Sequence, residues 1–325
     1  MDWLAYTLYL LSALVIVVTV LPLWGTARWW VRIWDFPRFQ VALLCVAILL
    51  AWIFARPAGA SWILIGALAA ALAWQMSWVW RYLPWAPYEV RKATGQPGAS
   101  NSISVLTTNV LQSNRDVGRL IDIISNAQPD VVLAVETDDW WCSELTDALS
   151  ASYCNTVRYP LSNGYGLTLL SKLELIKPEV RFVIDEAIPS IRAGVRLRIG
   201  QIVDLYCVHP QPPAPRQDST ERDCELLIVA QEIWERGRPA ILAGDLNDVA
   251  WSRSTLQFSR VGGLLDPRRG RGFYNTYPAL LPGFRYPLDY VFTTRHFDVC
   301  RMQVLPKFGS DHLPLLAEFQ LTAES

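Results

Sequence analysis

Three long stretches without a charged side chain occur before residue 81, and they limit what this chain can fold into. They cover residues 3–27, 39–55 and 57–80. A helix needs roughly 20 apolar residues to cross a bilayer, and the second stretch, with 17 residues, lies near the lower limit. We therefore predict three transmembrane helices at residues 3–24, 39–56 and 60–80. The alternative is a buried bundle in a soluble protein, whose helices would normally keep a polar face that these stretches lack.

Tryptophans gather at the ends of these stretches, where aromatic side chains anchor helices at the membrane surface. Eleven of the fifteen tryptophans precede residue 86. Those near the ends of the stretches are Trp24, Trp29, Trp30, Trp34, Trp78, Trp80 and Trp85. This placement favours helices that span a membrane.

The distribution of basic residues predicts the orientation of these helices. Arg28, Arg32 and Arg38 follow the first helix, and only Arg56 lies between the second and third. The segment after the third helix again contains basic residues, namely Arg81, Arg91 and Lys92. Cytoplasmic loops hold an excess of Lys and Arg. We therefore predict an N-terminus outside and a C-terminal part in the cytoplasm, with a periplasmic location left open.

The remainder of the chain has an ordinary globular composition. Five arginines and two aspartates give residues 1–88 a formal charge of +3, whereas the rest carries −4. A strongly basic nucleic-acid platform is therefore absent. Five cysteines after residue 88, an odd number without a CxxC pair, favour free thiols in a reducing compartment. We divide the chain into a membrane anchor (1–88), a Pro- and Gly-containing linker (89–101) and a globular domain (102–325).

Short apolar or alternating stretches predict many strands in this domain. The predicted strands cover residues 103–108, 131–135, 166–171, 181–184, 193–199, 202–208, 239–243, 287–293, 301–305 and 315–321. The predicted helices cover residues 116–127, 137–150 and 220–236. Short strands interrupted by a few helices favour an α/β fold, in which a two-sheet β-sandwich is flanked by helices.

Polar residues lie at the ends of five predicted strands. They are Asn109, Glu136, His209, the run Gly244-Asp245-Leu246-Asn247, and the run Ser310-Asp311-His312. A single residue of this kind is usually only a turn or cap residue. Five such positions in one chain point instead to a shared site, because a sandwich presents its strand ends at one rim.

These residues, with others, resemble the endonuclease/exonuclease/phosphatase family. The matching motifs, in order, are Thr108-Asn109, Val135-Glu136-Thr137, Asn163-Gly164-Tyr165-Gly166, Val208-His209-Pro210, Gly244-Asp245-Leu246-Asn247, Leu288-Asp289-Tyr290-Val291 and Ser310-Asp311-His312. The resemblance covers about residues 101–321, and the hydrophobic N-terminal part is similar to that of membrane-anchored bacterial members. It implies a phosphoester hydrolase of the bacterial inner membrane.

Phosphoester hydrolysis needs a hard cation, an activated water and donors for the phosphoryl oxygens. Mg²⁺ prefers oxygen ligands and takes one or two carboxylates. Glu136 is therefore the main candidate ligand, with Asn109 beside it, and the resemblance adds Asp311 as a direct or water-mediated support. We expect Mg²⁺, or Mn²⁺ in its place. The sequence has no CxxC pair, HExxH motif or His-rich cluster, so a zinc site is not predicted.

The remaining motif residues are candidates for the catalytic chemistry. His312 is expected to act as the general base or to stabilise the phosphate, since an imidazole titrates near neutrality. The resemblance implies that Asp289 orients His312, and that Asp245 positions or deprotonates the attacking water. Asn247 and His209 are expected to donate hydrogen bonds to phosphoryl oxygens.

Candidate substrate contacts are less sharply defined. Asn163 and Tyr165 either touch the substrate or only form a Gly-rich turn. The Pro-rich run 211–216 either rims the site, with Arg216 or Arg222 holding a second phosphate, or is a rigid loop. A local basic stretch could meet nucleic acid or anionic lipid heads, although a solvated charged face is the commoner outcome. It comprises Arg253, Arg260, Arg268, Arg269 and Arg271.

We therefore expect a membrane-anchored, Mg²⁺-dependent phosphoesterase that cleaves a phosphodiester or phosphomonoester. The expected partners are a phosphoester substrate (a lipid head group, a nucleotide or nucleic acid) and the lipid bilayer, without an obligate protein partner. A nuclease is the first alternative, although the −4 charge of the domain disfavours it. A catalytically silent binding or scaffold module is the second, and the intact motif residues argue against it.

Overall fold

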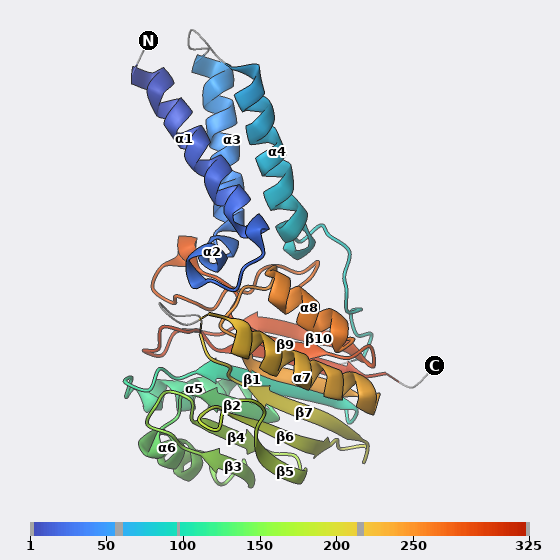
Figure 1. The fold of residues 1–325 in the computed structure, drawn as a ribbon. Coiled ribbons are helices and arrows are strands. Elements are labelled where there is room, and N and C mark those ends of the chain that lie inside the picture. Colours follow the sequence, from blue (N-terminus) through green and yellow to red (C-terminus); the bar gives the residue numbers. More distant parts are fainter. Residues whose placement is uncertain (1–2, 56–60, 96–97, 213–217, 323–325) are drawn as a thin grey trace.

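The computed structural model describes residues 3–55, 61–95, 98–212 and 218–322 (Figure 1). Within these ranges, eleven strands form a six-stranded sheet, in the order β10-β11-β1-β2-β4-β3, and a five-stranded sheet, in the order β5-β6-β7-β8-β9. The first sheet consists of β1 (Ser102–Asn109), β2 (Val131–Val135), β3 (Asn155–Tyr159), β4 (Leu167–Ser171), β10 (Phe297–Val304) and β11 (Leu315–Leu321). The second consists of β5 (Leu175–Phe182), β6 (Pro189–Arg196), β7 (Ile202–Val208), β8 (Ala240–Asp245) and β9 (Asp289–Thr293).

Each sheet contains one parallel pair of strands, and the other pairings are antiparallel. β1 runs parallel to β2, with Asn109 opposite Val135, and β7 runs parallel to β8, with Val208 opposite Gly244. Parallel neighbours need a crossover connection, usually a helix. Here α5 (Val117–Ala127) connects the first pair and α7 (Thr220–Arg236) the second. The carboxyl ends of all four strands consequently carry motif residues.

The domain is built in four layers, with the two sheets face to face and helices outside. Buried side chains of both sheets form the central core, among them Val105, Leu133, Leu205 and Ile241. Helices α5 and α6 (Asp139–Leu149) pack on the outer face of the first sheet. Helices α7 and α8 (Arg253–Val261) pack on the outer face of the second. The predicted two-sheet sandwich with flanking helices is confirmed.

In the globular domain, β3 and α8 were not predicted, and three strands are displaced from their predicted bounds, among them β10, which starts at Phe297 rather than at residue 301. β3 is an edge strand of alternating half-exposed residues, so it lacks the apolar run that marks a buried strand. Helix α8 lies in the stretch interpreted only as basic. β5 starts at Leu175 rather than at residue 181, and β6 ends at Arg196 rather than at residue 199.

Apolar helices α1 (Trp3–Val20), α3 (Arg38–Ala55) and α4 (Trp62–Val79) pack against one another and extend away from the sheets (Figure 1). Two continuous segments of the described chain, Trp3–Trp24 and Trp62–Tyr82, are long and apolar enough to span a membrane. The third candidate is bent by 66° between Trp29–Asp35 and Arg38–Phe54, and is a span only if both arms count together. The structure therefore offers two to three spans, where the sequence predicted three.

The lower ends of these helices are packed onto the globular domain. Short helix α2 (Trp29–Arg32) and the turn Ile33–Asp35 lie between the bundle and the sheets (Figure 1). The indole of Trp251 donates to the Asp35 carbonyl at 2.7 Å. Residues 89–101, expected to form a linker, also contact the domain where they are described, since Val90 belongs to the central core and Ala93 N donates to the Val299 carbonyl at 2.9 Å.

Candidate functional site

The two parallel strand pairs bring the predicted site residues to one edge of the sandwich. Asn109 ends β1 and Glu136 directly follows β2. Asp245 ends β8 opposite Asp289, the first residue of β9. The Ser310 hydroxyl donates to the Asn109 carbonyl at 2.7 Å and thereby fixes the turn that leads to His312. The strand-end residues of the sequence motifs are therefore neighbours in space.

The backbone at this edge needs particular residues. Gly244 has a φ of +147°, and a Cβ there would lie 1.8 Å from the Val208 carbonyl oxygen, so β7 and β8 approach closely only with glycine at this position. Glu136 and Asn247 also have positive φ values, 63° and 52°. Non-glycine residues in this region carry strain of about 1–3 kcal/mol and cluster at functional sites.

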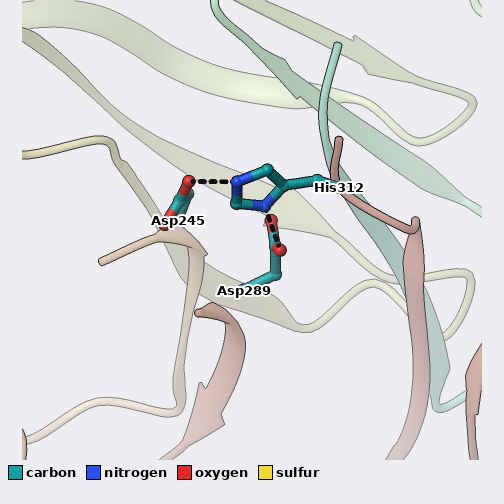
Figure 2. Close-up of side chains that lie close together, drawn as sticks. All are labelled: Asp245, Asp289 and His312. Carbon is teal, nitrogen blue, oxygen red and sulfur yellow. Dashed lines mark hydrogen bonds and ion pairs between the residues drawn. The ribbon is translucent and has the colours of Figure 1, made fainter. Parts of the chain in front are cut away.

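His312 lies between two buried carboxylates, as Figure 2 shows. Its Nδ1 is 2.8 Å from Asp289 Oδ2, and its Nε2 is 3.5 Å from Asp245 Oδ2. Asp245 and Asp289 are fully buried, and the ligand atoms of all three side chains lie within 4.8 Å of one another. Both ring nitrogens already face carboxylates, so this cluster fits an imidazole held by two acids better than an imidazole bound to a metal.

The charges around His312 control its protonation. Burial alone would lower the pKa of His312, but the carboxylates of Asp289 and Asp245 outweigh burial and raise it to about 10. Burial also raises the pKa of Asp245 above its usual value. The pKa of His209 is lowered by burial. The site thus contains one imidazole that prefers to be charged and a second that prefers to be neutral.

Glu136 and Asn109 form a second polar group beside this cluster. The Asn109 amide donates to Glu136 Oε1 at 2.7 Å and to Asp245 Oδ2 at 3.2 Å. Burial raises the pKa of Glu136, and the hydrogen bond from Asn109 opposes that effect. Glu136 and Asp311 both line one cavity beside the cluster, and the charge of Asp311 raises the pKa of Glu136 further.

This second group suits a hard cation. Glu136 and Asp311 are two carboxylates around one cavity, which matches the one or two that Mg²⁺ takes from proteins. A carboxylate whose pKa is raised by burial and by a like charge would gain from a cation beside it. The Asn109 amide oxygen instead accepts from Leu111 N at 2.9 Å, so Asn109 is placed to orient Glu136, and its role as a direct ligand stays a prediction.

The other predicted residues lie at different distances from the cluster. His209 Nε2 is 4.0 Å from Asp245 Oδ2, and the Tyr165 ring lies 5.6 Å from the His209 ring. The Asn247 amide donates to the Pro210 carbonyl at 2.9 Å. Asn163 is exposed and accepts from Tyr165 N at 3.1 Å, as expected of a turn residue. Arg216 lies outside the described residues.

Several residues around the site were missed or misjudged from the sequence. The Tyr277 ring lies 4.8 Å from the His312 ring, but residues 272–286 show no strand or helix pattern that would have singled it out. Asp248, which also lines the cavity, directly follows the run ending in Asn247, and its position next to that motif could have identified it from the sequence. Arg32 was used only to predict orientation, yet it lines the same cavity. Arg222 is buried, pairs with Asp223 and Asp248 and donates to the Asn247 carbonyl at 3.0 Å, so its guanidinium is engaged mainly within the protein.

The expected basic surface is only partly formed. Arg268 is buried and bonded to Asp266 at 2.9 Å, and Arg269 is paired with Glu89. Arg271 donates to the Val90 carbonyl at 2.7 Å. Arg253 and Arg260 are exposed. Two of these five arginines, Arg269 and Arg271, therefore hold the segment around residues 89–90 against the domain.

Fold and site together define an α/β sandwich with a buried carboxylate–imidazole–carboxylate cluster at its strand ends. The sequence profile described as Endonuclease/Exonuclease/phosphatase family matches residues 106–312. The chain belongs to this family. No curated protein matches the chain.

Solved structures show the same fold. An endonuclease/exonuclease/phosphatase from Beutenbergia cavernae has a TM-score of 0.57 at 21% identity, over 69% of this chain and 72% of that chain. D. rerio TDP2, complexed with a single-strand DNA product, has a TM-score of 0.57 at 18% identity, over 67% of this chain and 99% of that chain. Sphingomyelinase C from Streptomyces griseocarneus has a TM-score of 0.51 at 18% identity, with the same coverages. At these identities, the likeness shows the fold and leaves the substrate open.

Proposed function

We propose that this protein is a membrane-anchored, divalent-cation-dependent phosphoesterase. The observation that carries the proposal is the placement of His312 between Asp245 and Asp289, next to Glu136. His312 and the two aspartates can transfer protons, and Glu136 offers oxygen ligands for a cation. Phosphoester hydrolysis needs both.

Glu136 and Asp311 would hold the cation, and Asn109 would fix the Glu136 carboxylate through its 2.7 Å hydrogen bond. A bound Mg²⁺ would supply a Lewis acid for the phosphoryl oxygens. Mn²⁺ has similar ligand preferences and would serve in its place.

Asp245 and His312 divide the proton chemistry. An imidazole with a raised pKa holds its proton at neutral pH, so His312 fits the second of its two expected roles, in which its positive charge stabilises the phosphoryl oxygens. Asp245 would accept a proton from the water as the water oxygen bonds to phosphorus. The bond from phosphorus to the leaving oxygen breaks, and that oxygen takes up a proton from solvent.

His209 would assist as a neutral hydrogen-bond donor. It is buried, its lowered pKa keeps it uncharged, and within the described part of the chain its Nδ1 has no hydrogen-bond partner. An unpaired buried polar atom costs about 1–3 kcal/mol. A phosphoryl oxygen would satisfy it.

The test measures Mg²⁺-dependent release of p-nitrophenol from bis-p-nitrophenyl phosphate by the purified full chain, with DNA and phospholipid as parallel substrates. We expect hydrolysis of at least one substrate that EDTA abolishes and that His312→Ala reduces by at least about 100-fold. His296→Ala is the matched control, because His296 lies at the far end of β9 and bonds to Thr294. Equal release by the wild type and His312→Ala on every substrate would overturn the proposal.

The predicted orientation can be tested on the same protein. Three spans would place the N-terminus outside and the domain in the cytoplasm, as the basic residues predict. Cys154 and Cys224 are exposed on the domain. An impermeant maleimide should therefore label them only after the cells are lysed, and labelling in intact cells would place the domain in the periplasm.

A further inference from the structure

The cavity above the candidate site has two chemically different walls. It measures about 650 Å³, and its polar wall includes Glu136, Asp311 and His312. A second part of the lining comes from residues 29–37, the connection between the first two apolar helices. Ile33 and Trp34 lie there, and Ile33 is 50% exposed. The part of the chain that leads into the bilayer is therefore also part of the site.

This apolar wall is fixed to the domain. Arg32, the last residue of α2, bonds to Asp223 and to Asp248, each at 2.8 Å. The Phe36 ring packs on the Tyr286 ring with a centroid distance of 5.4 Å. Residues 29–37 are therefore held in place as one side of the cavity.

A hairpin closes the third side and reaches toward the bundle. Tyr277 and Tyr286 pair with each other and both line the cavity. At the hairpin tip, Leu280, Leu281 and Phe284 are 75%, 56% and 61% exposed. The Gln40 side chain, in the first turn of α3, donates to the Gly283 carbonyl at 3.3 Å. The apolar tip thus lies level with the start of an apolar helix, where a membrane surface would be.

The charges in the cavity disfavour a polyphosphate or nucleic-acid substrate. Arg32 and Arg222 line it, but both are bonded to Asp223 and Asp248. Their guanidinium groups are therefore used within the protein. One phosphoester can be bound at the polar wall, and the rest of the cavity favours an apolar group.

We propose that residues 29–37 and the hairpin 277–286 form a subsite for the apolar chain of an amphiphilic phosphoester that enters from the bilayer surface. The phosphoester would lie against Glu136 and His312, and the chain would run along Ile33 toward the hairpin tip. This inference rests on the proposed function for the reacting end of the substrate. The subsite itself is defined by the walls of the cavity.

The first experiment compares methyl and octyl p-nitrophenyl phosphate, which share the reacting group, on the full chain in lipid nanodiscs. We expect kcat/KM for the octyl ester to exceed that for the methyl ester at least tenfold. Ile33→Asn and Ile33→Trp should each reduce that ratio at least fivefold while changing methyl-ester hydrolysis less than twofold. Ile228→Asn is the matched control, because Ile228 is also 50% exposed but lies on α7, away from the cavity. An unchanged ratio in both Ile33 variants would overturn the subsite.

The second experiment does not depend on hydrolysis and so separates the two proposals. A non-hydrolysable octyl phosphonate with a terminal diazirine is photo-cross-linked to the protein, and the labelled peptides are identified by mass spectrometry. The subsite is supported if the probe labels residues 29–37 or 277–288, and if octyl phosphonate but not methyl phosphonate prevents that labelling. This result would hold even if neither ester is cleaved. Labelling confined to the outer faces of α1 and α4 would overturn it, even if the methyl ester is cleaved and His312→Ala abolishes that cleavage.

Discussion

The two halves of the candidate catalytic edge have the same topology but end in different residues. In β1–α5–β2 and in β7–α7–β8, two parallel strands and a crossover helix place a polar residue at each strand end. The first unit ends in Asn109 and the half-buried Glu136, which faces the cavity. The second ends in His209 and the fully buried Asp245, which faces His312. The same topology thus gives an open carboxylate in one half and an enclosed carboxylate in the other.

This difference in burial suits the two carboxylates to different tasks, one to cation binding and the other to proton transfer. An open carboxylate can exchange its water for a cation, whereas an enclosed one interacts strongly with the imidazole beside it because little solvent screens the pair. The halves also differ in their attachment, since Val79 and Tyr82 pack with the outer layer of the second sheet, whereas α5 and α6 cover the first. The apolar helix bundle therefore contacts the half that we assign to proton transfer.

The largest expected effect is on the enclosed carboxylate. Asp245→Asn should reduce kcat by about 10³-fold, since loss of an acid–base group typically costs 10²–10⁴-fold. The concentration of Mg²⁺ at half-maximal rate should stay within about threefold, because the halves divide their tasks. Steady-state rates over a range of Mg²⁺ concentrations measure both, with the exposed Asp147→Asn as control. A large shift in the Mg²⁺ requirement of Asp245→Asn would show that the two carboxylates do not have separate tasks.

The open carboxylate should show the opposite pattern. Glu136→Gln keeps the shape of the side chain but removes its charge, so we expect the Mg²⁺ requirement to rise by about 100-fold, the upper range for weakened metal sites. At saturating Mg²⁺ the rate should recover most of its wild-type value. Isothermal titration with Mn²⁺ provides a direct binding readout. If excess metal restores nothing, Glu136 takes part in the chemical step and the assignment is wrong.

The sequence predicts those site residues whose position depends on a single strand, and misses those that only tertiary packing brings to the site. Asn109, Glu136, His209 and Asp245 were identified because each follows an apolar strand, and a strand end is placed by its own sheet. The sequence did not identify Tyr277 or residues 29–37 as parts of the site, because only tertiary packing brings them there. The bent connection between the first two apolar helices was likewise read as a loop, since its tryptophans fit a membrane surface equally well.

The orienting role of Asp289 predicts a pH effect. Asp289→Asn removes the closer carboxylate, so the pKa of His312 should fall from about 10 toward 6.5 in metal-free protein. A raised folded-state pKa adds stability that is complete below pH 6.5 and is lost as the pH rises through about 10. As the pH rises from 6.5 to about 10, the melting temperature in EDTA should therefore fall more steeply in the wild type than in the variant.

The same variant should lower kcat only about tenfold, less than loss of the acid–base group itself. Imidazole ¹⁵N shifts of His312 give the pKa directly, with His296 as an internal reference in the same spectrum. An identical His312 titration in the wild type and the variant would show that Asp289 does not set its charge, and the enclosed half would then need another explanation.

The smallest expected effect concerns the link between the connection at residues 29–37 and the enclosed half. Arg32 bonds to Asp248, which directly follows Asn247, and Asp248 keeps Arg222 at 2.9 Å when Arg32 is lost. A hydrogen bond contributes about 0.5–1.5 kcal/mol, so Arg32→Leu should lower kcat for the methyl ester by about three- to tenfold with little change in KM. The exposed Arg28→Leu, directly before this connection, is the control.

Arg32→Lys distinguishes positioning from simple stability. A lysine can reach one of the two aspartates but cannot bridge Asp223 and Asp248 as a planar guanidinium does. We therefore expect Arg32→Lys to retain the wild-type melting temperature and to recover only part of kcat. If kcat instead follows the melting temperature across all three variants, the connection at residues 29–37 only stabilises the fold. The enclosed half would then work independently of the apolar helices that contact it.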